Sequence, residues 1–92
     1  EFINPKDFNL SQPYPNPLNP ETVITFEVSK KAYIQLEVFN SIGKKVATLQ
    51  KGNFEPGQHK AMWNGQNYPS GVYLIRIKTE DYSQLRKVIL MK

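Results

Sequence analysis

The sequence predicts an all-β fold, a β-sandwich of about seven antiparallel strands with no significant helix. Three observations support this prediction. Short runs of alternating apolar and polar residues recur along the chain, turn-forming residues separate them at short and regular intervals, and no segment of useful length has helical periodicity. Two antiparallel sheets that bury alternate side chains between them produce this pattern.

The chain begins with a proline-rich lead-in to the first long strand. Prolines stand at positions 13, 15, 17 and 20. Proline lacks a backbone donor and fixes its own φ, and it moves the preceding residue toward extended conformations. We therefore expect residues 13–21 to form a stiff strap with a specific docked path, sealing one end of the sandwich. Residues 1–12 are expected to be a linker or cloning remnant, in which Phe8 and Leu10 are candidates for a short edge strand.

The first half of the chain contains three predicted strands: Thr22–Val28, Ala32–Asn40 and Lys44–Gln50. The first two alternate strictly and place one set of residues on a common face: Ile24, Phe26, Val28, Ile34, Leu36 and Val38. The turn before the third strand contains Gly43, which can adopt a positive φ. Val46 and Leu49 interrupt the period of two, which predicts a bulge or an edge position.

The second half contains two predicted loops, Lys51–Gly57 and Asn64–Gly71, both rich in turn-forming residues. The strands predicted around them are Gln58–Asn64, Val72–Thr79 and Tyr82–Met91. The shared faces of the first two are His59, Ala61 and Trp63, and Tyr73, Ile75 and Ile77. The last strand presents Leu85, Lys87, Ile89 and Met91 on one face and Arg86, Val88 and Leu90 on the other.

With the short first strand, the count reaches the seven strands of an immunoglobulin-like sandwich. Trp63 is the single tryptophan of the chain. We expect its indole to be the centre of the core, because one large side chain can bridge both sheets.

Composition excludes several classes of protein. The 92 residues make one domain, and the chain has no cysteine and therefore no disulfide framework. No run of about 18 apolar residues is present, so we expect no membrane span. The formal charge of +4 comes from scattered pairs of basic residues. We interpret these as a soluble surface that protects strand edges in preference to a site for nucleic acid or an anionic polysaccharide.

Five short motifs in order resemble one known family. They are Tyr14-Pro15-Asn16-Pro17 with Asn19-Pro20, then Ile34–Asn40 with Gly43 and Val46, then Gly57-Gln58-His59 with Trp63-Asn64-Gly65, then Ser70-Gly71-Val72-Tyr73, and lastly Lys87–Lys92. In this order and spacing, residues 13–92 resemble the type A C-terminal sorting domain carried by cargo proteins of the type IX (Por) secretion system of Bacteroidetes.

The resemblance implies a non-catalytic signal that directs a larger cargo protein, encoded upstream in the same chain. Such cargo passes from the periplasm of a Gram-negative bacterium through a translocon and is secreted or held on the outer membrane surface. A sortase-like peptidase commonly removes the domain and joins the cargo to an anionic lipopolysaccharide. The motif residues are expected to be structural, with turn glycines and a core Trp63 and Tyr73: Pro15, Asn16, Pro17, Asn19, Pro20, Gly43, Gly57, Trp63, Gly65, Gly71 and Tyr73.

The last strand is the expected recognition element. Its apolar run lies between basic residues and ends the chain. Strand addition to an exposed edge is a common mode of recognition. The hypothesis assigns the translocon contact to Lys87, Val88, Ile89, Leu90, Met91 and Lys92.

The sequence predicts no enzyme, metal or cofactor. His59 is the one histidine, no nucleophile elbow accompanies Ser70 or Ser83, and neither a phosphate-binding glycine loop nor metal-ligand spacing occurs. Glu27 and Glu37 are expected to face outward on neighbouring strands, without the deep cleft of a glycosidase.

Two alternatives remain open. The first is a carbohydrate-binding module appended to a secreted enzyme, which needs exposed aromatic rings in line; the candidates are Tyr14, Phe54, Tyr68 and Tyr82. The second is a spacer that only stabilises its neighbour. The sequence leaves open the cargo, the cleavage point, the oligomeric state, the surface that is recognised, and whether Glu1-Phe2 are native.

Overall fold

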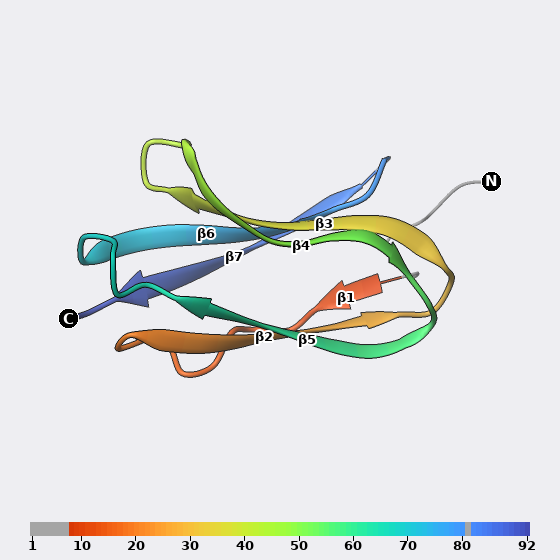
Figure 1. Cartoon of the computed structure of the whole chain (residues 1–92), viewed down its shortest axis with the longest axis horizontal. Helices are drawn as coiled ribbons and strands as arrows, with labels where there is room; N and C mark the ends of the chain where they lie inside the picture. Colours follow the sequence, from red (N-terminus) through yellow and green to blue (C-terminus); the bar gives the residue numbers. More distant parts are fainter. Residues whose placement is uncertain (1–7, 81) are drawn as a thin grey trace.

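A computed structural model of the chain describes residues 8–80 and 82–92, which form seven strands and no helix (Figure 1). The strands are β1 (Phe8–Leu10), β2 (Glu21–Val28), β3 (Ala32–Asn40), β4 (Lys45–Phe54), β5 (Gly57–Asn64), β6 (Gly71–Lys78) and β7 (Ser83–Leu90). The predicted all-β class and strand number are confirmed. Within the described part, no helix is long and apolar enough to cross a bilayer.

The strands form two antiparallel sheets stacked face to face. One sheet has the order β1-β2-β5 and the other the order β4-β3-β6-β7. Figure 1 shows the second sheet above the first, with the carboxyl end of the chain at the left. This arrangement confirms the predicted immunoglobulin-like sandwich.

The prediction for the third strand was half right. The pairing of β4 with β3 has two register shifts, and Leu49 and Val46 have no paired residue on β3 at these shifts, as expected for bulges. β4 is also an edge strand. The prediction of a loop over Lys51–Gly57 is wrong, because β4 continues to Phe54. β6 pairs with β3 only from Gln35 onward, so residues 32–34 pair with β4 alone, and the extension of β4 to Phe54 continues the ladder along that edge of β3.

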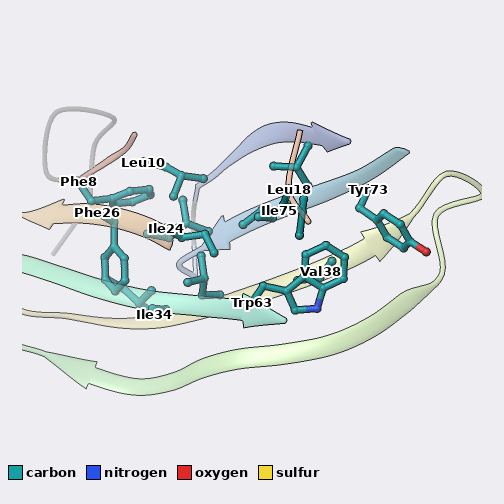
Figure 2. Packing of buried hydrophobic residues seen from close by; sticks show 14 of the residues in the cluster. Phe8, Leu10, Leu18, Ile24, Phe26, Ile34, Val38, Trp63, Tyr73 and Ile75 are labelled. Carbon is teal, nitrogen blue, oxygen red and sulfur yellow. The ribbon is translucent and has the colours of Figure 1, made fainter. Parts of the chain in front are cut away.

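The core lies between the sheets and contains the residues that alternation predicted. Every member of the shared faces of β2, β3 and β6 is buried, as are Val88 and Leu90 of β7. Figure 2 shows some of these side chains between the two layers, among them Ile24, Phe26, Ile34, Val38 and Ile75.

Two aromatic clusters organise this core, which corrects the expectation of a single central indole. Trp63 of β5 is buried and its ring centroid lies 5.0 Å from that of Tyr73 on β6, so it does bridge the sheets. Phe26 forms a second cluster toward the other end, 5.4 Å from Phe54 and 5.5 Å from His59 (Figure 2). Neither ring system alone spans a sandwich of this length, whose longest dimension is 42 Å.

The short strand β1 completes the three-stranded sheet. Phe8 and Leu10 are buried, and the Phe8 ring centroid lies 5.1 Å from that of Tyr82. The expected edge strand is therefore present. The rest of the predicted linker, residues 1–7, lies outside the described residues.

Candidate functional site

The proposed recognition segment, Lys87–Lys92, divides into an inward and an outward set of side chains. Val88 and Leu90 are fully buried in the core. Lys87, Met91 and Lys92 are exposed, and Ile89 is half-buried. Only the outward set is open to a partner, while the inward pair holds the strand on the sandwich.

The proline strap covers the free backbone edge of this segment. The Asn16 side chain lies against it like a peptide group: its Nδ2 donates to Lys87 O at 3.1 Å and its Oδ1 accepts from Ile89 N at 2.9 Å. Leu18 N donates to Ile89 O at 2.8 Å, and Met91 N donates to Leu18 O at 3.0 Å. Strand addition at this edge, the expected mode of recognition, is therefore blocked along Lys87–Met91, because its backbone groups already have partners.

The same strap is tied to the other sheet. Tyr14 and Val23 exchange two backbone hydrogen bonds of 3.0 and 2.8 Å, and Thr22 Oγ1 donates to Pro15 O at 2.9 Å. The peptide bonds before Pro15, Pro17 and Pro20 are cis. The strap thus runs along β2, crosses to β7 and joins the sheets at their side. It has a docked path, but along the side of the sandwich and not across one end as expected.

Sequence reasoning missed three of the residues that build this junction. Gln12 Nε2 donates to Lys87 O at 3.1 Å, Gln84 Oε1 accepts from Leu10 N at 2.9 Å, and Leu18 is fully buried beneath the crossing. Each hydrogen bond joins residues more than 70 positions apart. Alternation in the sequence carries no signal for such contacts. The apolar Leu18 among prolines was the one available hint of a buried anchor.

The remaining motif residues occupy turns or the core. Gly43 closes the β3–β4 turn with φ of 86°, and its N–H donates to Asn40 O at 3.0 Å. Gly65 is buried, and a Cβ there would lie 2.9 Å from Leu90 Cδ2. Trp63 and Tyr73 are core residues, and the Tyr73 hydroxyl donates to Pro69 O at 2.6 Å. The other motif residues lie in the strap or at strand ends and are exposed or half-buried: Pro15, Asn16, Pro17, Asn19, Pro20, Gly57 and Gly71.

One carboxylate departs from its expected position. Glu27 and Glu37 lie in different sheets, not on neighbouring strands. Glu37 is on the outer face of β3 but is buried, because Arg76 Nη2 at 2.8 Å and Lys45 Nζ at 3.3 Å close over it. Burial by itself raises the pKa of this carboxyl, and the hydrogen bonds and charges of Arg76 and Lys45 outweigh it, so its pKa is lowered from 4.5.

The single histidine and the surface hollows are accounted for as follows among the described residues. His59 Nε2 lies 2.8 Å from Glu55 O, and its ring packs on Phe26 and Phe54. Three open surface hollows, of about 260, 390 and 260 Å³, are lined by at most one carboxylate each, Glu27 in the first and Glu80 in the second. In residues 8–80 and 82–92 no three histidine or acidic side chains gather as metal ligands.

The chain is similar to one known protein family. A family model described as the secretion system C-terminal sorting domain matches residues 12–91. No curated protein and no solved structure is significantly similar to the chain. The matched range contains the strap, six of the seven strands and every residue of the five motifs except the final Lys92. The resemblance found in the sequence is thereby confirmed, and the chain belongs to the family of C-terminal sorting domains of secretion systems.

Proposed function

We propose that this chain is a non-catalytic address that directs a cargo protein through the type IX secretion system to the cell surface. Membership of the sorting-domain family is the observation that carries the proposal. The cargo precedes the domain in the same polypeptide, and the partners are the translocon in the outer membrane and a sortase-like peptidase that separates domain from cargo.

The structure supports a role as a recognised surface. The described residues pack their apolar side chains between two sheets, and the outer faces of those sheets carry side chains that a partner can contact. Within the segment Lys87–Lys92, we assign recognition to the outward side chains of Lys87, Ile89, Met91 and Lys92. Val88 and Leu90 hold them in position from inside the core.

The deciding experiment fuses residues 1–92 to a reporter that is exported to the periplasm of a type IX-competent host. The whole chain is used because Phe8 and Leu10, which precede the matched range, belong to the core. We expect the fused reporter at the cell surface and the unfused reporter in the periplasm. Equal retention of both in the periplasm would contradict the proposal.

The terminal segment is tested by substitution and not by deletion, because deletion would also remove the buried Val88 and Leu90. The triple variant Lys87→Ala, Met91→Ala, Lys92→Ala removes only exposed side chains. We expect this variant to remain folded and to accumulate in the periplasm. Delivery at the wild-type level would show that these side chains are not the recognition site, and it would not contradict the address function.

The carbohydrate-binding alternative has little structural support. A sugar platform needs exposed rings in line, but the rings of Phe54, Tyr68 and Tyr82 pack on the core aromatics Phe26, Trp63 and Phe8. Tyr14 is exposed, and it stands on the strap. Retention of the chain on cellulose or xylan, lost in Tyr68→Ala, would favour this alternative.

A further inference from the structure

The covered edge of β7 limits how the terminal strand can be recognised. Backbone groups of Lys87, Ile89 and Met91 point to the edge where the strap lies. Lys87 O, both Ile89 N and O, and Met91 N are hydrogen-bonded to the strap. The opposite edge of β7 pairs with β6. A partner that contacts residues 87–91 in the folded domain must therefore contact their side chains, and those on the outer face of the sheet are available.

The strand register shows which side chains share that face. Val72 lies opposite Ile89, Leu74 opposite Lys87, and Arg76 opposite Leu85. On the next strand, Phe39 lies opposite Leu74. We call the resulting surface the terminal-strand face, and its members are Phe39, Val72, Leu74, Leu85, Lys87, Ile89 and Met91. Val72, Leu85 and Met91 are 40%, 50% and 56% exposed.

The opposite outer face, on the three-stranded sheet, is the natural comparison. There Thr25 lies opposite Lys60, and Glu27 opposite Gln58. Its one strongly exposed apolar side chain on paired strands β2 and β5 is Met62, 56% exposed. A contiguous exposed apolar surface is a mark of an interaction site, whereas single exposed apolar residues are ordinary. The terminal-strand face is of the first kind.

Positive charges predominate on the outer face of the four-stranded sheet. The register places cations on β4, β6 and β7 of this outer face, and these are Lys45, Lys51, Arg76, Lys78 and Lys87. Glu37 is the one carboxylate on the outer face of the described strands of this sheet, and Arg76 and Lys45 already neutralise it. The other sheet exposes Glu21 and Glu27 on its outer face. Of the two outer faces, the one carrying the terminal-strand face is therefore the more positive.

We propose that the terminal-strand face is the docking surface for the secretion machinery, and that the partner presents an apolar patch bordered by carboxylates. The proposal rests on the address function proposed above and specifies its partner. An apolar centre with a charged rim is the usual anatomy of a protein interface, and opposite rim charges accelerate and orient encounter. The signal is thus a folded surface drawn from β3, β6 and β7, not the linear peptide at the end of the chain.

A substitution at Val72 distinguishes recognition of the folded surface from recognition of the linear peptide, because Val72 lies on β6 and outside Lys87–Lys92. The variant Val72→Asp puts an acidic group on the face, opposite Ile89. Met62→Asp is the matched control, an exposed apolar residue of the opposite outer face changed in the same way. Both are made in the fusion of residues 1–92 with the exported reporter, and the melting temperature of each variant chain is measured.

We expect surface delivery to fall on the order of tenfold or more for Val72→Asp, as for a residue that contributes strongly to an interface, and to stay at the wild-type level for Met62→Asp. If Val72→Asp lowers the melting temperature more than Met62→Asp does, the variant Lys87→Glu is used to test the docking surface. Lys87 is exposed, and reversing its charge should also lower delivery because it would face the partner's carboxylates.

Other outcomes overturn the inference separately from the proposed function. If the wild-type fusion and all three variants are delivered equally well, the address function is supported but the terminal-strand face is not the docking surface. If sedimentation shows a dimer of the wild-type chain that Val72→Asp dissociates, the face binds a second copy. If the wild-type fusion itself stays in the periplasm, the address function fails first.

Discussion

Among single residues, Glu37 shows how a charged side chain can be buried without entering the core. Alternation assigns it to the outer face of β3, where water would normally solvate a carboxylate. Its neighbours across the sheet are Arg76 on β6 and Thr48 on β4, and the Arg76 guanidinium also lies 4.6 Å from the centre of the Phe39 ring. The long cationic side chains cover the carboxylate and compensate its desolvation. Local burial here depends on partners from two other strands.

The depressed pKa of Glu37 makes stability depend on pH. A carboxyl group whose pKa is lower in the folded state contributes stability above its unfolded pKa, near 4.5, and loses it as the pH falls through the folded value. At pH 7 we expect Glu37→Gln to lower the free energy of unfolding by about 1–3 kcal/mol. The deficit relative to wild type should shrink as the pH falls below about 4.

Urea unfolding at several pH values measures this effect. The matched control is Glu55→Gln, because the ion pair of Glu55 with Lys31 is more than half exposed on both sides. Its expected change is within about 0.5 kcal/mol. A Glu37→Gln deficit that is the same at pH 7 and pH 3 would show that the charge of Glu37 contributes nothing to the fold.

Among the structural elements, the strap has the most specific path. It contributes no strand of its own to the four-stranded sheet, yet it supplies the hydrogen-bond partners that the edge of β7 would otherwise lack. An uncovered edge invites pairing with another chain. The proline-rich strap therefore protects the terminal strand from edge association while leaving its outer face exposed.

Asn16→Ala should weaken this junction. It removes the two side-chain hydrogen bonds to Lys87 O and Ile89 N, and we expect a loss of about 1–2 kcal/mol of unfolding free energy. Hydrogen exchange at the Ile89 amide should become faster, because its N–H loses its acceptor. Asn19→Ala, at an exposed position of the same strap, is the control. Equal protection of the Ile89 amide in both variants would mean that Asn16 does not hold this edge.

For the whole molecule, the folding unit extends beyond the range that defines the family. The match begins at residue 12, whereas β1 ends at Leu10 and inserts two apolar side chains into the common core. β1 also contacts β7 across the side of the sandwich. A fragment that starts at the family boundary would therefore leave this part of the core open to water.

Leu10→Ala tests the contribution of β1. Leu10 is fully buried, and truncation of such a residue costs about 2–4 kcal/mol, which in a domain of this size lowers the melting temperature by about 10–20 °C. Tyr14→Ala, at a side chain that is 79% exposed, should change it by only a few degrees. Thermal unfolding followed by circular dichroism measures both, and similar small shifts would show that β1 is dispensable.

The sequence by itself determined the strands, their faces and the family. The alternation in β2, β3 and β6 identified the buried residues, and the irregular spacing of Val46 and Leu49 located the bulges. These features follow from local chain geometry, because side chains of a strand alternate whatever lies beside it. Gly43 likewise indicated the turn before β4, because the positive φ that this position needs is a local property of the backbone.

The tertiary structure decided what depends on neighbouring strands. The length of β4, the burial of Glu37, the pairing of Asn16 with β7 and the second aromatic cluster around Phe26 all require partners distant in sequence. The exposed edge expected at the terminal strand was covered for the same reason. Alternation specifies which face of a strand is apolar, but only the order of strands in the sheets specifies what lies against each edge and each outer face.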